Sequence, residues 1–90
     1  MCWNYRVLAI EDGNELYFRI HSVYYNEDGK PDGYSAQPAT NGSGSIEGLE
    51  YVLDLMREAL KKPILWGDNR FPEECKDLTI KTNKNEDQED

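Results

Sequence analysis

Three side chains in this 90-residue sequence could support nucleophilic or acid–base chemistry: Cys2, His21 and Cys75. An imidazole beside a thiol or a carboxylate can move a proton during a reaction, but the sequence marks no partner for His21. Cys75 follows two glutamates, and adjacent carboxylates oppose formation of the thiolate that a nucleophile needs. We therefore expect no catalytic residue. A small ligand-binding or enzymatic domain that uses His21 among tyrosines is the alternative.

The sequence also offers no convincing site for a metal or a cofactor. Two cysteines and one histidine at these separations match no zinc spacing. The stretch Asp28–Gly33 has the composition of a calcium loop, but Lys30 stands where a ligand is needed, so a hairpin turn is favoured. The stretch Gly42–Ser45 lacks the spacing and the lysine of a nucleotide-binding loop, and Glu47 would repel an anion. We expect no cofactor and no bound metal.

Aromatic residues are the most suggestive feature, because six Tyr, two Trp and two Phe occur in a short chain. Tyrosines favour protein interfaces, since each combines apolar area with a polar group. Filling a small core is the alternative explanation. Stacking on nucleic-acid bases would require surrounding positive charge, which is missing. The cluster expected on or near the second and third strands consists of Tyr17, Tyr24, Tyr25 and Tyr34.

The charge excludes several classes of partner. The net charge is −8, and both halves of the chain are acidic. Such a chain cannot bind nucleic acid by neutralising phosphates, and an anionic membrane would repel it. A protein with a basic surface would attract it. The N-terminus lacks a signal-peptide pattern and no apolar run reaches about 20 residues, so we expect a cytoplasmic protein. Whether Cys2 and Cys75 form a disulfide is left open.

The elements that must position these side chains follow from the pattern of apolar and turn residues. Alternation predicts strands over residues 5–10 and 15–25, joined by a turn at Glu11–Asn14. A slip in the alternation predicts a β-bulge near His21–Ser22. Pro31 cannot donate to a ladder, so a short edge strand is expected over residues 33–37.

One amphipathic helix is the most secure prediction. Ser45 is a suitable N-cap, Glu47 favours the helix dipole, and Pro63 ends the helix. Residues 63–66 should pack on the core or add an edge strand, and residues 78–80 are a further short strand. The apolar stripe that we expect to face the core comprises Ile46, Leu49, Val52, Leu53, Met56, Ala59 and Leu60.

The order of elements predicts an α+β fold in which a three-stranded antiparallel meander packs against one helix, with short extended C-terminal pieces. Residues 1–82 form a single domain and residues 83–90 an acidic, disordered tail. One helix covers one face of a sheet. The second face is therefore exposed unless the C-terminal segment or a second subunit covers it.

Parts of the sequence resemble a family of small uncharacterised bacterial proteins. The similar stretches are Asn4–Val7, Ile20–Pro31 and Ala59–Leu65, so the resemblance covers residues 4–65. It implies no activity, and no functional residue can be transferred from it.

These observations predict a non-enzymatic, acidic protein-binding module or inhibitor. It could block the basic nucleic-acid-binding site of a partner, as small acidic proteins do in phage–host conflict, including inhibitors of the anti-CRISPR type. A homodimer that packs its uncovered sheet faces together is a further possibility. A solvated helix face is the alternative explanation for the acids. The residues expected to contact the partner are Glu47, Glu50, Asp54 and Glu58 on the helix, with Tyr17, Tyr24 and Tyr25 on the sheet.

Overall fold

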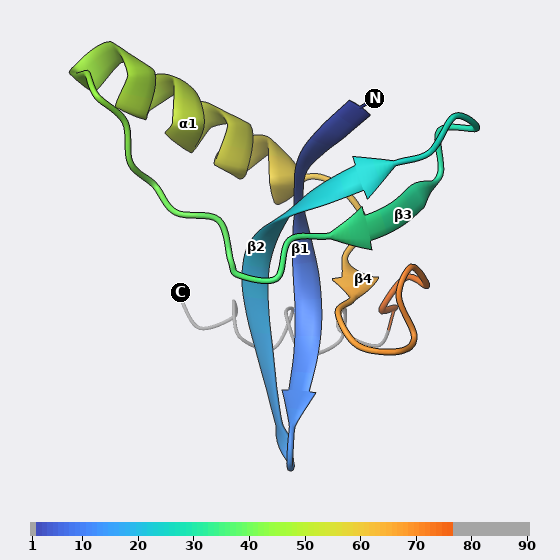
Figure 1. Ribbon diagram of the computed structural model, residues 1–90. Coiled ribbons are helices and arrows are strands. Elements are labelled where there is room, and N and C mark those ends of the chain that lie inside the picture. The colour runs from blue at the N-terminus through green and yellow to red at the C-terminus, as the bar shows by residue number, and fades with distance from the viewer. Residues whose placement is uncertain (1, 77–90) are drawn as a thin grey trace.

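The computed structural model describes residues 2–76, so the strand predicted at 78–80 and the tail at 83–90 lie outside the described residues. The fold is α+β, as predicted (Figure 1). Its sheet has four strands in the order β3-β2-β1-β4, and β4 runs parallel to β1. The elements are β1 (Cys2–Asp12), β2 (Glu15–Tyr25), β3 (Pro31–Tyr34), α1 (Ile46–Ala59) and β4 (Leu65–Trp66).

The predicted three-stranded antiparallel meander is therefore wrong in detail. Strands β1, β2 and β3 are antiparallel neighbours. The difference lies at β4, where Leu8 pairs with Leu65 and Ala9 with Trp66. A helix between two strands can carry the chain back to the end where the first strand began, which makes the next strand parallel. The apolar run after Pro63 thus becomes part of the sheet.

A two-residue turn sets the register of the long β1–β2 hairpin. Asp12 pairs with Glu15, and Gly13 has a φ of +66°. Asn14 has no positive φ, so the turn follows the type II′ pattern, with glycine first. The pairing continues without interruption to Cys2 and Tyr25, so the bulge predicted near His21–Ser22 is wrong. The register shift lies at Tyr24/Tyr25 instead, on the side of β3.

Strand β3 begins at Pro31 rather than at Gly33. It lies at one edge of the sheet, where the missing N–H of proline costs no ladder hydrogen bond. The turn before it is a compact loop: the Asn26 Oδ1 accepts hydrogen bonds from the backbone N–H groups of Asp28 (2.9 Å) and Lys30 (3.1 Å). The hairpin-turn interpretation of this stretch is confirmed.

The core lies around the middle of β1, where the four consecutive residues Arg6 to Ala9 are buried. Because side chains alternate between the faces of a strand, four buried neighbours mean that both faces are covered. On one face Leu8 packs with Val23 and Leu65, next to Tyr34 and Phe71. On the other face Ala9 packs with Cys75, beside Leu16, Ile64 and Trp66. The C-terminal segment thus helps to cover the sheet, which is one of the two ways in which we expected the second face to be covered.

Helix α1 begins where predicted, because the Ser45 Oγ accepts a hydrogen bond of 3.0 Å from the backbone N–H of Gly48. It covers less of the sheet than its apolar stripe predicts. Its main contacts are with β1, and Figure 1 shows its N-terminal end projecting away from the strands. Only Ala59 of the helix is buried, while Ile46 is 77%, Leu60 66% and Leu53 47% exposed.

Candidate functional site

The four helical acids predicted to bind a partner lie on one exposed side of α1. Glu47, Glu50, Asp54 and Glu58 are all exposed. Residues three or four positions apart in a helix lie on the same face, so these carboxylates form a continuous row, which we call the acidic stripe. One of them is engaged: the Lys61 Nζ lies 3.3 Å from the Glu58 Oε2. The other three make no ion pair with any of residues 2–76.

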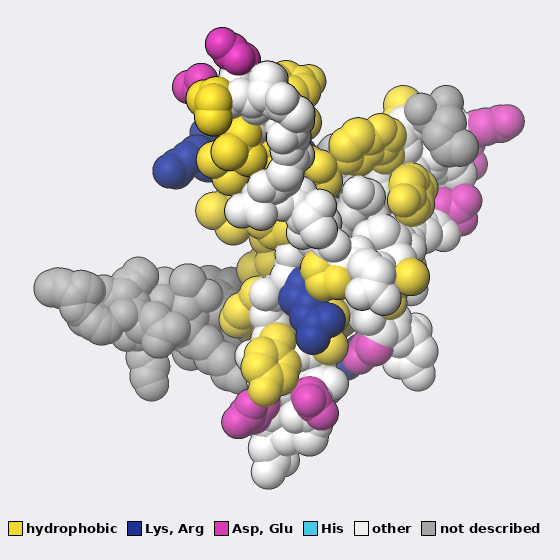
Figure 2. All heavy atoms as spheres, turned by 60° about the vertical axis from the view of Figure 1, so that its left-hand side comes forward, with side chains coloured by type: hydrophobic (Ala, Val, Ile, Leu, Met, Phe, Trp, Pro, Cys, Tyr) yellow, Lys and Arg dark blue, Asp and Glu magenta, His cyan; other side chains and the backbone are white. Residues whose placement is uncertain are grey.

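An exposed row of aliphatic side chains runs beside the acidic stripe. Ile46, Leu53 and Leu60 are seven residues apart, so they follow one line along the helix, and we call them the aliphatic row. Leu53 and Leu60 border a shallow groove between α1 and β2, which is also lined by Ile20 and Met56. Figure 2 shows hydrophobic side chains exposed on the upper lobe, with acidic side chains at its tip. This helix therefore presents apolar and acidic groups together.

The tyrosines predicted at the site do not form one surface. Tyr17 (42% exposed) is paired with Ile10, and Tyr24 (41% exposed) with Trp3. Because these tyrosines have opposite parity in β2, they lie on opposite faces of the sheet. The Tyr17 hydroxyl donates a hydrogen bond of 2.5 Å to the Glu15 Oε1. This bond to a carboxylate raises the pKa of Tyr17 above its ordinary value.

Tyr25 belongs to a partly buried polar network that sequence reasoning missed. Its hydroxyl accepts a 2.8 Å hydrogen bond from the Arg6 guanidinium and donates one of 2.8 Å to the Asn4 Oδ1. Arg6 also donates to the Pro63 carbonyl at 2.8 Å, and it makes no ion pair within residues 2–76. The one available signal was a charged residue inside an apolar run, at Arg6. The network joins β1, β2 and the segment after α1.

His21 lies in the core, directly across the β1–β2 ladder from Arg6. Its Nδ1 is 3.0 Å from the Ser35 carbonyl, which can only accept, so Nδ1 carries the proton. Its ring meets the Tyr34 ring edge to face, with centroids 5.5 Å apart. The Nε2 has no hydrogen-bond partner among residues 2–76. His21 is thus held among sheet side chains, where it helps to pack the segment after β3.

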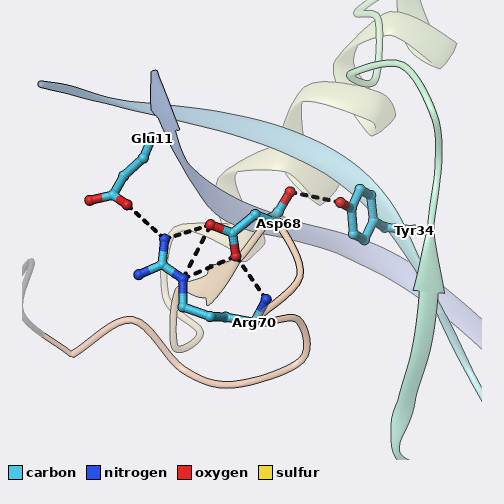
Figure 3. Close-up of polar contacts among 5 residues, drawn as sticks. Glu11, Tyr34, Asp68 and Arg70 are labelled. Atoms are coloured by element: carbon cyan, nitrogen blue, oxygen red, sulfur yellow. Dashed lines mark hydrogen bonds and ion pairs between the residues drawn. The ribbon is translucent and has the colours of Figure 1, made fainter. Parts of the chain in front are cut away.

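A second polar cluster ties the loop after β4 to the hairpin. The Arg70 guanidinium stacks over Trp66, with Cζ 3.4 Å from the ring centroid, and bonds to both Asp68 and Glu11 (Figure 3). These hydrogen bonds lower the pKa of Asp68 below its ordinary value. Nearby, the Tyr34 hydroxyl donates to the Gly67 carbonyl at 2.7 Å. The cluster fixes residues 67–71 against β1 and β3.

The remaining sequence candidates are separated in space. Cys2 is exposed with a free thiol, while Cys75 is buried against Ala9, so no disulfide joins them. Within residues 2–76 no group of three or more His, Cys, Asp or Glu side chains could hold a metal ion. The single helix of this part of the chain is too short and too polar to cross a membrane.

Comparison with known proteins adds no assignment. No family model matches the chain, and neither a curated protein nor a solved structure matches it significantly.

Proposed function

We propose that this chain is a non-enzymatic protein-binding module that docks through the outward side of α1 onto a partner with a basic, partly apolar surface. The observation that carries the proposal is the aliphatic row beside the acidic stripe. Scattered exposed apolar residues are ordinary on a protein surface. Three on one line of one helix, next to a row of acids, are typical of a helix that inserts its apolar face into a groove.

The two rows would have different roles in docking. Burying Ile46, Leu53 and Leu60 would supply most of the affinity, since apolar area removed from water is worth about 25 cal/mol per Å². The acidic stripe would speed association and select a basic partner. The helix carries four acids and Arg57 as its only base. A partner groove with apolar pockets and a lysine- or arginine-rich rim therefore fits best.

A protein that normally binds nucleic acid is one partner with such a rim. In that case docking would cover the site that contacts phosphates, and the chain would act as an inhibitor of the phage–host conflict type. The net charge of −8 supports this version, because the whole molecule would be drawn to a basic groove.

The test compares two triple variants with the same change in charge. The helix variant carries Glu47→Gln, Glu50→Gln and Asp54→Asn. The control variant carries Glu27→Gln, Asp28→Asn and Asp32→Asn, at exposed positions of the β2–β3 turn and of β3. Partners captured from a cell lysate on wild type are identified, purified and titrated against all three proteins. We expect at least a tenfold loss of affinity for the helix variant alone.

Two results would remove the proposal. One is equal affinity of the helix variant and wild type for every purified partner. The other is an equal loss for the control variant, which would show that net charge, and not the helix, governs binding. An Ile46→Ser, Leu53→Ser, Leu60→Ser variant then measures the aliphatic row separately, with folding checked by circular dichroism.

A further inference from the structure

The distal half of the β1–β2 hairpin has an unpaired outer edge. Strand β3 pairs with β2 at Val23, Tyr24 and Tyr25, and Ala39 adds one backbone hydrogen bond of 2.8 Å to the Ile20 carbonyl. Nearer the turn, no strand within residues 2–76 pairs with the side of Glu15–Arg19 that faces away from β1. Figure 1 shows this part of the hairpin extending beyond the other elements.

The backbone groups at this edge belong to Leu16 and Phe18. Ser22 and Ile20 accept hydrogen bonds from Ser35 and Ala39 on the outer side of β2. Because backbone groups of an antiparallel strand point to alternate sides from one residue to the next, those of Leu16 and Phe18 also point outward. They are available to a new strand, and an open edge of this kind is a template for strand addition.

The side chains along this edge are complementary to their own copy. In an antiparallel pair related by a two-fold axis at Tyr17, Glu15 lies opposite Arg19 of the second copy, and Arg19 opposite Glu15. On the other face Leu16 lies opposite Phe18 of the second copy, and Phe18 is 49% exposed in the single chain. Opposite charges and apolar residues in directly opposed positions stabilise strand pairs.

The hydrogen bonding fits the same register. With the axis at Tyr17, Leu16 of the first copy forms a hydrogen-bonded pair with Phe18 of the second copy. Phe18 of the first copy forms another with Leu16 of the second. All four residues have outward backbone groups. An axis at Phe18 would require the Ile20 carbonyl, which already accepts from Ala39. In this register the turn of the second copy, at Gly13-Asn14, ends beside Ile20, where the hydrogen bond from Ala39 begins. The second copy therefore fills the unpaired part of the β2 edge without displacing Ala39.

We propose that two copies of this chain associate through the outer edges of β2, in antiparallel register about Tyr17, to form one continuous eight-stranded sheet. The interface is isologous, because the same edge serves both copies. It uses the edge of the sheet and not its faces, which are covered near the core. It does not use the acidic stripe, so it stands independently of the proposed function. Its small size predicts a weak, reversible dimer.

A charge exchange tests the register. Sedimentation velocity is measured from about 10 µM to about 1 mM, a range suited to weak association, with enough salt to screen the repulsion between two acidic chains. We expect wild type to form dimers as the concentration rises. Arg19→Glu should abolish the dimer by placing Glu15 opposite a glutamate. The double variant Glu15→Arg, Arg19→Glu should restore it.

A disulfide test measures the geometry directly. In a Cys2→Ser background, Tyr17→Cys places two thiols across the axis in a non-hydrogen-bonded pair, at a Cα separation of about 4.5 Å. That separation permits a disulfide. The matched control Phe18→Cys places its thiols on a diagonal, about 7–8 Å apart. We expect a covalent dimer from Tyr17→Cys alone under mild oxidation.

The proposal is overturned by wild type that sediments as a monomer at every concentration. It is also overturned if the double variant stays monomeric although circular dichroism shows that it is folded, or if the two cysteine variants cross-link equally. The Glu47, Glu50, Asp54 helix variant should dimerise like wild type. The docking proposal for α1 and the dimer proposal for β2 can therefore fail separately.

Discussion

The middle of β1 and the helix α1 carry similar apolar residues but bury them to very different extents. Leu8 is 0% exposed on one covered face of β1, whereas Leu60, the C-cap of the helix, is 66% exposed. The difference arises from neighbours: β1 is flanked by strands on both sides and covered on both faces, while α1 meets the sheet mainly along β1. The folding free energy thus depends mainly on the first region, whereas the apolar side chains of the aliphatic row contribute little to it.

The largest expected effect comes from applying the same substitution in both regions. Leu8→Ala should lower the free energy of unfolding by about 3 kcal/mol, because it removes buried methyl groups and leaves a cavity. Leu53→Ala on the helix should change it by less than about 0.5 kcal/mol. Urea denaturation followed by tryptophan fluorescence measures both. Similar losses for the two variants would show that the aliphatic row is packed and not available for docking.

The second-largest effect is expected in the polar network of Arg6, Tyr25 and Asn4. Tyr25→Phe should cost about 1–3 kcal/mol, because the Arg6 Nη1 and the Asn4 Oδ1 each lose a hydrogen-bond partner in a partly buried network. Tyr24→Phe is the matched control, since Tyr24 is exposed, and it should lie within about 0.5 kcal/mol of wild type. If the two phenylalanine variants unfold at the same urea concentration, the network contributes nothing.

A smaller effect is expected at the start of α1. Ser45→Ala removes the acceptor for the Gly48 N–H and should cost about 1 kcal/mol. Because α1 has few contacts with the sheet, the loss should appear first as fraying of the helix. Amide exchange at residues 46–50 should therefore accelerate while that of β1 is unchanged. Equal acceleration in β1 would mean that the helix and the sheet unfold together.

The smallest effect is the pH dependence that Asp68 confers. Its folded pKa lies below the ordinary value of 3.8, so its stabilising contribution is complete above that value and disappears as the pH falls through the folded pKa. Asp68→Asn should cost no more than about 1 kcal/mol near pH 7, since half-exposed ion pairs are worth little. The difference from wild type should shrink from about pH 4 downward. A difference that stays constant as the pH falls below 3.8 would contradict this cause.

Local chemistry in the sequence predicted the local features of the fold. Ser45 caps the helix as predicted, although the helix ends at Ala59, a few residues before the predicted stop at Pro63. Gly13 and Gly29 mark the two turns, and the residue types of β2 suited a strand. Each of these depends on a few adjacent residues. The parallel pairing of β4 and the burial of Arg6 were missed because both depend on where the chain returns after α1.

In the candidate site, too, the sequence predicted the features that depend on neighbouring residues and missed those that depend on the tertiary arrangement. Helical periodicity placed the acidic stripe on one exposed face, which required only the rise and turn of a helix. It could not show that the aliphatic row would be left uncovered, because that depends on the angle at which α1 meets the sheet. Tyr17, Tyr24 and Tyr25 were grouped by proximity in sequence, but strand alternation and the contact with Arg6 separate them.

The most direct test of the docking role of α1 is amide hydrogen exchange of the chain with and without a purified captured partner. We expect slower exchange across residues 46–60 when the partner is present, with no change in β1. Protection confined to the sheet, with α1 exchanging as in the isolated chain, would contradict it.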